Sequence, residues 1–303
     1  MKKLLIFFLL VSKVIIAQNI PVSSDDKILN LGEKYYYPII SQDGKKIAFT
    51  TQNFKGLYVF DFKTKKIIQV SDKSGVGYKP VFSDDSKNIY YRSNEYVGIK
   101  KYSTIFGYNL KNDTKSVIGK RSRDMLPPKV INNILVYEEG GNIKTKQISK
   151  MERNSPEPLI YTYIENQKIV VFKNGVKTIL TPKGAGNYIW PELSPDKTKL
   201  LFTFAGHGTF ICDLKGNILA DIGYLNASKW LNNNWVIGMK DHDNGDVFTE
   251  SDIYAVGING NETVQLTNTV DEIEMYPDCS ADGTKIVYHT LDGNIHLMTV
   301  NYK

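Results

Sequence analysis

Short runs in which apolar and polar residues alternate occur along most of the chain, and each run is bounded by turn-forming residues. Ile47 and Phe49 form one such run, and Ile286 and Tyr288 form another. A period of two places one set of side chains on one face of an extended strand, which is the signal for a half-buried β-strand. We therefore expect an all-β protein.

Four of these regions are copies of one pattern. Residues 37–49, 79–91, 190–202 and 276–288 align without gaps. Their shared frame is Pro, any residue, an apolar residue, Ser, any residue, Asp, a turn residue, then Ile or Leu and an aromatic residue two places later. Ser and Asp bond to nearby backbone amides in tight turns, and a Pro at the first position of a strand costs no ladder hydrogen bond. Each copy predicts a β-hairpin.

The spacing of the copies predicts a ring of repeated sheets. The prolines at 38, 80, 191 and 277 are 42, 111 and 86 residues apart, so copies must lie between them. Weaker copies begin near Pro128 and near Trp230, which makes six. A period near 40 residues with four strands per repeat is typical of β-propellers. The stretch from residue 125 to residue 186 is either one long blade or hides a seventh.

Each hairpin is followed by two more strands, which predicts blades of four antiparallel strands. Leu57–Asp61 and Ile67–Val70 are one such pair. The final copy lacks its fourth strand, whereas an unassigned strand at residues 27–31 precedes the first copy. We expect that strand to complete the last blade and so remove the exposed sheet edge. The predicted fold is a six-bladed β-propeller closed by an N-terminal strand, with seven blades as the alternative.

The Ser-X-Asp-Gly hairpin preceded by an aromatic residue and Pro resembles the repeat of the TolB-like propellers of bacterial envelopes. The resemblance covers residues 27–303, although only two of the four clear copies keep Asp-Gly. It implies the fold rather than a function, because related propellers serve as binding scaffolds, peptidase gating domains and carbohydrate-active enzymes. TolB carries a further N-terminal domain and works with envelope partners. We expect that domain to be missing here, so only the propeller transfers.

The N-terminus has the pattern of a secretory signal peptide. Lys2 and Lys3 precede an apolar block that ends at Ala17, and cleavage there would leave residues 18–303 as one propeller domain. The block is short for a bilayer span and contains Lys13, so a retained anchor is the weaker alternative. No Cys follows for a lipoprotein anchor. We expect a bacterial periplasmic, secreted or cell-surface protein, a monomer without a transmembrane anchor after signal cleavage.

Charge and cysteine content narrow the choice of partners. The formal net charge is +6, and removal of the leader with its three lysines leaves +3, which is too small to indicate nucleic-acid binding. Cys212 and Cys279 could form a disulfide in an oxidising compartment. Both stand in apolar positions of strand-like runs, however, so we expect two buried free thiols.

Several residues that suggest catalysis have structural explanations. The repeated Ser-X-Asp pairs are turns, and the sequence contains no Gly-X-Ser-X-Gly motif for a serine hydrolase. His289 and His296 alternate with apolar neighbours and are expected to have structural roles. Sequence features therefore favour a protein that is not an enzyme.

Propeller geometry predicts which residues share one rim. The inner strand of a blade starts on the face to which the loop between the second and third strands returns. Residues just before the prolines should therefore lie beside those loops, around the axial funnel. The candidate binding residues are Tyr36, Tyr78, Tyr188, His207 and His242. Aromatic side chains with a few polar groups are common in ligand sites. The alternative is that these tyrosines pack between blades.

The segment around Gly245 is rich in oxygen ligands. Asp241, Asp243 and Asp246 resemble a calcium loop, but Gly245 is one residue early for an EF-hand and no bidentate Glu follows. A solvated acidic turn is the favoured interpretation, and we expect no cofactor.

Two functional hypotheses follow. The favoured one is an exported, non-enzymatic binding or scaffold propeller that engages an envelope protein, a peptide segment or a glycan at its axial funnel. The other is a carbohydrate-active lyase or hydrolase that uses the His and Asp residues of the rim. A glycosidase would need two carboxylates about 5–10 Å apart in one pocket.

Overall fold

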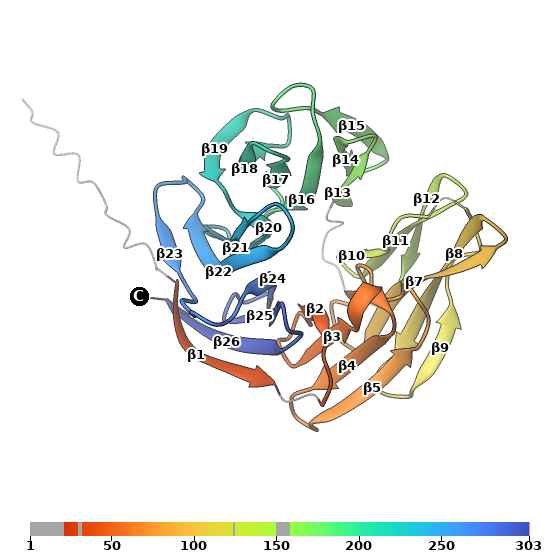
Figure 1. The fold of residues 1–303 in the computed structure, drawn as a ribbon. Helices are drawn as coiled ribbons and strands as arrows, with labels where there is room; N and C mark the ends of the chain where they lie inside the picture. Colours follow the sequence, from red (N-terminus) through yellow and green to blue (C-terminus); the bar gives the residue numbers. More distant parts are fainter. Residues whose placement is uncertain (1–20, 30–31, 124, 150–157, 303) are drawn as a thin grey trace, which may run out of the picture.

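The computed structural model describes residues 21–29, 32–123, 125–149 and 158–302. These residues form seven antiparallel sheets arranged in a ring (Figure 1). The protein is therefore a β-propeller, as the sequence predicts. We number the sheets as blades 1 to 7 by the chain order of their strands nearest the centre, and we call these the inner strands. The predicted signal peptide, residues 1–17, lies outside the described residues.

Blades 1 to 4 occupy the first part of the ring. Blade 1 contains β2 (Tyr36–Ile40), β3 (Lys46–Thr50), the short 3-10 helix η1 (Gln52–Phe54), β4 (Leu57–Asp61) and β5 (Lys66–Ser71). Blade 2 contains β6 (Val81–Phe82), β7 (Asn88–Val97), β8 (Lys100–Asn109) and β9 (Thr114–Val117). Blade 3 contains β10 (Lys129–Ile131), β11 (Ile134–Glu139) and β12 (Asn142–Gln147). Blade 4 contains β13 (Ile160–Glu165), β14 (Lys168–Lys173) and β15 (Val176–Leu180).

Blades 5 to 7 have four strands each. Blade 5 contains β16 (Tyr188–Leu193), β17 (Lys199–Phe204), β18 (Gly208–Asp213) and β19 (Ile218–Gly223). Blade 6 contains β20 (Asn226–Trp230), β21 (Trp235–Asp243), β22 (Phe248–Gly257) and β23 (Thr263–Gln265). Blade 7 contains β24 (Glu274–Cys279), β25 (Lys285–Thr290), β26 (Ile295–Tyr302) and β1 (Pro21–Leu29).

The N-terminal strand closes the ring. β1 pairs antiparallel with β26, from Pro21 opposite Tyr302 to Leu29 opposite Ile295. It is the outermost strand of blade 7, so blade 7 is built from both ends of the described chain. The predicted closure is confirmed, although the strand starts at residue 21 rather than 27, and residues 30 and 31 lie outside the described residues.

The long stretch after Pro128 contains two blades instead of one, so the alternative count of seven is the correct one. Within the described residues, blades 3 and 4 have three strands each. Their first two strands are joined by Asn132-Asn133 and by Asn166-Gln167, and all four residues have positive φ. Two-residue turns of this kind form tight hairpins without Ser or Asp. The repeat motif is therefore lost here although the hairpins remain.

The Ser-X-Asp pairs are turns, as predicted. In the four clear copies the Ser hydroxyl donates to the Asp carboxylate over 2.5–2.7 Å. The same hydroxyl accepts the backbone N–H five residues later, for example from Lys199 to Ser194 over 2.9 Å. These serines are buried, so each motif closes the hairpin between the first two strands of its blade.

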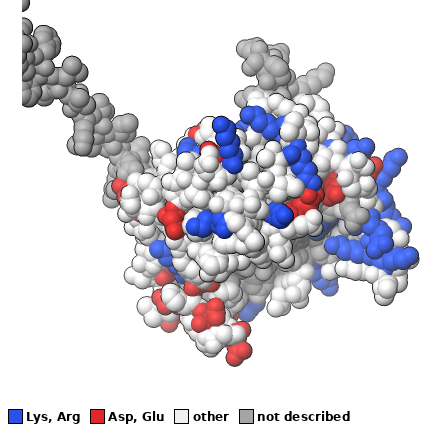
Figure 2. All heavy atoms as spheres, turned by 90° about the horizontal axis from the view of Figure 1, so that it is seen from above, with Lys and Arg blue, Asp and Glu red and all other residues white. Residues whose placement is uncertain are grey.

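Charge is unevenly distributed around the ring. Residues 92–123, mostly in blade 2, contain eight Lys or Arg and two Asp or Glu, whereas residues 235–257 in blade 6 contain one Lys and five acids. In Figure 2, basic side chains gather on the right, the side on which blades 2 and 3 lie in Figure 1, and acidic ones gather at the lower left. A basic stretch of the sequence and an acidic one thus lie on different sides of the ring.

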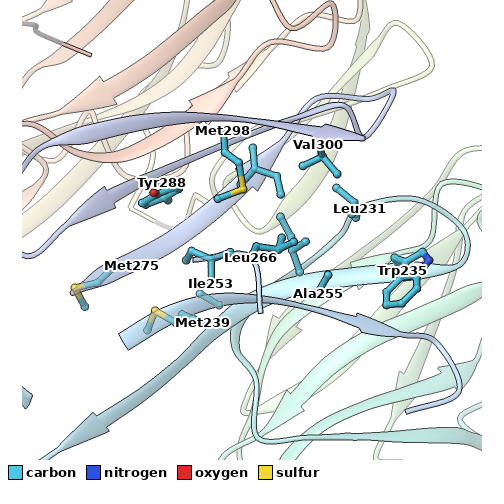
Figure 3. Packing of buried hydrophobic residues seen from close by; sticks show 13 residues of the cluster. Leu231, Trp235, Met239, Ile253, Ala255, Leu266, Met275, Tyr288, Met298 and Val300 are labelled. Carbon is cyan, nitrogen blue, oxygen red and sulfur yellow. The ribbon is translucent and has the colours of Figure 1, made fainter. Parts of the chain in front are cut away.

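Apolar clusters between neighbouring blades hold the ring together. Between blades 6 and 7, Trp235 and Met239 on β21 and Ile253 on β22 pack with Tyr288 on β25 and Met298 on β26 (Figure 3). Similar clusters join blade 7 to blade 1 and blade 1 to blade 2. Burial of apolar surface contributes about 25 cal/mol per Å², so these contacts between blades are a main source of stability.

Both cysteines are free thiols, as predicted, but Cys279 is only partly buried. Cys212 is buried in blade 5, and the Cys279 thiol lies 3.1 Å from the carbonyl oxygen of Trp230 on the neighbouring inner strand. Among the residues that the structure describes, no helix has the length and apolar character needed to span a membrane.

Candidate functional site

A repeated backbone bulge opens the inner strands on one face of the ring. The strand register shifts between Tyr36 and Ile39 in blade 1, and at the matching points of blades 5, 6 and 7. The residue inside each bulge has a φ of 47–53°, and so does its counterpart in blade 2; these residues are Tyr37, Lys79, Trp190, Ala227 and Tyr276. Residues other than Gly rarely adopt this conformation, and it costs roughly 1–3 kcal/mol each.

The starts of the inner strands and the loops between second and third strands lie on one face. Tyr36, at the start of β2, pairs with Thr50 at the end of β3, so the loop after Thr50 returns to the same face. Phe54 in that loop stacks on Tyr37, with ring centroids 4.5 Å apart. The bulges and the loops between second and third strands therefore meet on one axial face.

Six rings from blades 7, 1 and 2 are in contact on this face. Tyr37 lies 4.9 Å from Tyr276 and 5.1 Å from His289 between ring centroids. Phe54 then contacts Tyr78 at 5.2 Å. We call this set the aromatic cluster; its members are Tyr36, Tyr37, Phe54, Tyr78, Tyr276 and His289. His289 is buried, while Tyr78 is at the surface.

Two cations extend the aromatic cluster on its blade 2 side. The Lys79 ammonium and the Arg92 guanidinium each lie 5.6 Å from the centre of the Tyr78 ring. Arg92 also donates to the carbonyl oxygen of Met125 over 2.6 Å, which fixes its position. Cations at this distance are attracted to the face of an aromatic ring.

Charged side chains occupy equivalent positions on four inner strands. Lys129, Glu192, Lys229 and Asp278 pair with Val136, Leu201, Ile237 and Val287 at matching points of their hairpins. Three of them immediately follow Pro in the repeat frame, at the position that accepts any residue. Because inner strands surround the axis, matching positions converge there. We call these four residues and Lys79 the axial cluster.

Lys229 holds the two carboxylates of the axial cluster together. Its ammonium lies 3.8 Å from Glu192 Oε1 and 3.7 Å from Asp278 Oδ1. Asp278 also accepts the backbone N–H of Ile40 over 2.9 Å, which ties blade 7 to blade 1. The exposed fractions of the Lys229, Glu192 and Asp278 side chains are 41%, 35% and 20%. Water therefore still reaches these ions.

The axial cluster contains three lysines and two carboxylates, so Lys79 and Lys129 leave it with an excess of positive charge. Burial lowers the pKa of Lys129 to about 8, and repulsion from Lys79 acts in the same direction. Burial also lowers the pKa of Lys79, with Lys229 adding repulsion. Both carboxylates already face Lys229, and the charge of Glu192 raises the pKa of Lys229. An anionic group placed beside Lys79 and Lys129 would stabilise their charged forms.

The acids of the blade 6 segment have separate hydrogen-bond partners. Asp241 is buried and accepts hydrogen bonds from the Tyr224 hydroxyl over 3.0 Å and from the Asn226 amide over 2.8 Å. Asp243 accepts the Gly245 N–H over 2.8 Å, and Asp246 is exposed. Within the described part of the chain, no three His, Cys, Asp or Glu side chains are grouped as metal ligands.

The candidate binding residues are divided among different places. Tyr36 and Tyr78 belong to the aromatic cluster. Tyr188 is fully buried in blade 5, where its hydroxyl bonds to the backbone of residues 183 and 184, so it offers no surface to a ligand. His207 stacks on Phe204 of the same blade at 4.8 Å. His242 is exposed near the tip of the β21–β22 hairpin.

Sequence reasoning missed the axial cluster. The signal was present in the repeat itself, since the residue after each proline is Ile39, Val81, Lys129, Glu192 or Asp278. A charged residue at this position of an inner strand cannot pack against a neighbouring blade without a partner. Once the fold is known, a charged residue at that position is therefore expected to lie near the propeller axis.

Comparisons with known proteins agree with the fold. No protein-family model matches the chain, and no curated protein sequence matches it. A chain in the crystal structure of the mitotic checkpoint complex is similar, with a TM-score of 0.61, 11% identity, and coverage of 99% of this chain and 100% of that one. The Cps50 (Swd1) β-propeller domain of Myceliophteria thermophila has a TM-score of 0.59, 8% identity, and coverage of 93% and 100%.

A third similar structure is described as "putative TolB" from Agrobacterium tumefaciens. Its TM-score is 0.54 at 16% identity, with 89% of this chain and 91% of that chain covered. At such identities the likeness concerns the fold alone. The chain is a seven-bladed β-propeller, counted over the described residues, with a fold similar to that TolB structure.

Proposed function

We propose that this chain is an exported, non-enzymatic binding propeller that holds a segment of an envelope protein at the axial face. The observation that carries the proposal is the adjacency of the aromatic cluster and the axial cluster. Tyr276 and Asp278 are two residues apart on β24, and Lys79 follows Tyr78 directly. Aromatic rings bordered by converging ionic groups are typical of a binding site.

The charges favour a protein segment that carries carboxylates. Lys79 and Lys129 repel each other, and the carboxylates of the axial cluster are held by Lys229. An Asp or Glu side chain of a partner would supply the missing negative charge, while its apolar neighbours could pack on Tyr78 and Tyr37. A neutral glycan would supply no such charge.

The geometry gives less support to a carbohydrate-active enzyme. Asp241 is engaged by Tyr224 and Asn226, and Asp243 is engaged by a backbone N–H. On the axis, Glu192 and Asp278 both contact the Lys229 ammonium. Two carboxylates paired with one lysine do not supply the separate acid and base, or acid and nucleophile, that glycoside hydrolysis needs.

A peptide selection tests the binding role. Residues 18–303 are suitable because all seven blades, with the pairing of β1 and β26, lie within residues 21–302. A phage library of random 12-residue peptides, selected on this protein, should yield sequences that combine Asp or Glu with aromatic or aliphatic residues. The double variant Lys79→Met/Lys129→Met should weaken the selected peptides about tenfold or more. The exposed Lys215→Met in blade 5 is the matched control and should leave affinity unchanged.

Two results would oppose the binding role. One is the enrichment of no acidic motif, and the other is equal affinity in the double variant and the wild type. Export is tested separately by mass spectrometry of the envelope fraction, where we expect a chain that begins at Gln18. A chain that keeps its leader in the cytoplasm would contradict export without affecting the binding site.

A further inference from the structure

The β7–β8 hairpin projects beyond the ring with large apolar side chains at its tip. Tyr96, Val97 and Ile99 have exposed fractions of 67%, 53% and 99%. The turn between the two strands is formed by Gly98, with a φ of 58°, and Ile99. A two-residue turn needs no aliphatic side chain for its own stability, and such residues clustered at a projecting tip commonly mark an interaction surface.

Basic side chains surround this tip. Lys100 pairs with Val97 and Lys101 pairs with Tyr96 in the hairpin register, and both lysines are exposed. The Glu95 carboxylate is neutralised by Arg121, whose Nε lies 3.1 Å from it. Arg121 also lies 3.9 Å from the Tyr102 ring.

The neighbouring segment adds to the positive charge. A bridge between Ser103 and Ser122 holds residues 120–123, which include Lys120, Arg121 and Arg123, alongside β8. Basic side chains are concentrated on this side of the molecule in Figure 2. The three apolar side chains of the tip therefore project from a region of basic side chains.

The corresponding hairpin of blade 6 differs in the apolar content of its tip and in its charge. Its tip is formed by residues 243–248, where Asp243 and Asp246 flank Asn-Gly, and Val247 is its exposed aliphatic side chain. Both hairpins extend from the axial face that carries the aromatic cluster. A negatively charged surface would therefore attract the blade 2 side of that face and repel the blade 6 side.

We propose that the β7–β8 hairpin docks this propeller onto an anionic lipid bilayer. Tyr96, Val97 and Ile99 enter the headgroup region, and Lys100, Lys101 and Arg123 contact the anionic headgroups. Partial insertion of apolar side chains together with electrostatic attraction is the usual basis of peripheral membrane binding. A projecting tip can insert into a lipid headgroup layer, because that layer deforms around it. Because the hairpin extends past Arg92 beside Tyr78, docking turns the aromatic cluster toward the membrane.

Vesicle sedimentation tests the docking. Residues 18–303 are used because the apolar leader would bind lipid by itself. The protein is mixed with phosphatidylcholine vesicles, with or without about 30% phosphatidylglycerol. We expect the bound fraction to be at least about fivefold higher on the anionic vesicles, and to fall strongly when salt is raised from about 0.05 to 0.5 M.

Two variants separate the apolar and electrostatic contributions. Val97→Asp/Ile99→Asp should lower the partition coefficient about tenfold, and Lys100→Ser/Lys101→Ser should remove the preference for anionic lipid. Val247→Asp, on the exposed tip of the acidic hairpin, is the matched control and should bind as the wild type does. All of these side chains are exposed, so equal thermal midpoints are expected and confirm folding.

Three results would overturn the docking proposal. These are no sedimentation with anionic vesicles, equal sedimentation with both kinds of vesicle, and unchanged sedimentation of Val97→Asp/Ile99→Asp. Peptide binding at the axial face is measured without lipid, so its success or failure is independent of this experiment.

Discussion

The ammonium of Lys229 lies 3.7 Å from the carboxylate of Asp278, although the two residues belong to different blades. They stand at matching positions of β20 and β24, so their contact follows from the convergence of inner strands. Glu192 on β16 completes the arrangement from a third blade. The ring thus places ions from separate repeats around one axis, directly beside the aromatic cluster.

Removal of Lys229 should destabilise the ring. Lys229→Met leaves Glu192 and Asp278 facing each other without a cation. A fully buried pair broken in this way costs about 3–5 kcal/mol, but partial exposure of these side chains reduces the expected loss to about 1–2 kcal/mol. Urea unfolding measures it. Lys229→Arg is the control and should retain most of the stability, whereas equal losses in both variants would indicate a packing effect instead.

Glu274 should make the wild type less stable as pH rises. Its side chain is fully buried at the start of β24, and burial raises its pKa to about 7. Between the ordinary pKa of 4.5 and 7, the unfolded chain loses a proton that the folded chain keeps, so the free energy of unfolding falls across that window.

The variant Glu274→Gln removes this dependence. Its stability relative to the wild type should increase by roughly 2 kcal/mol between pH 4.5 and pH 8. Urea unfolding at both pH values measures the change. A difference that stays constant with pH would show that Glu274 is ionised in the folded protein.

His289 should make the wild type less stable as pH falls. It is buried among Tyr36, Tyr37 and Tyr276, and burial lowers its pKa from 6.5 to about 4. As pH falls through this window the unfolded chain binds a proton that the folded chain refuses, so wild-type stability decreases. His289→Phe keeps an aromatic ring and should gain about 2 kcal/mol relative to the wild type from pH 7 to pH 4. Parallel stability curves would contradict the neutral, buried imidazole.

Calcium should not stabilise the protein. The three acids Asp241, Asp243 and Asp246 do not share one site, and Asp241 is already bonded to Tyr224 and Asn226. A ligand of the folded state raises the thermal midpoint. We therefore expect calcium and EDTA to give midpoints within about 1 °C of each other. A clear rise with calcium, abolished in Asp243→Asn/Asp246→Asn, would establish a cation site in this loop.

The turn chemistry made most of the fold predictable. The buried Ser of each Ser-X-Asp turn bonds to atoms within its own hairpin, so the sequence motif and the local structure have the same cause. Blades 3 and 4 were harder to separate because Asn132-Asn133 and Asn166-Gln167 achieve the same reversal through positive φ. The strands of both hairpins could be recognised in the sequence, but the Ser-X-Asp motif used to count the blades was absent.

The proposed binding face was predictable only in part. Its location followed from propeller geometry, and Tyr36 and Tyr78 lie in it. Tyr188 stands one residue earlier in the repeat than Tyr36, at the position of the buried Tyr35. A shift of one residue turns a strand side chain to the opposite face, and the Tyr188 hydroxyl accordingly bonds to the backbone of residues 183 and 184. The axial cluster was hidden for a different reason, since its charges come from five repeats and meet only when the blades surround one axis.

Site-specific cross-linking of a selected acidic peptide tests the central claim most directly. A photoreactive p-benzoylphenylalanine is placed at Tyr78 in the aromatic cluster, and in a second protein at Val117, an exposed position on β9. We predict a strong cross-link from position 78 that is lost with Lys79→Met/Lys129→Met, and little from position 117. Equal cross-linking from both positions, or a cross-link from position 78 that persists in the double variant, would contradict binding of the segment at the axial face.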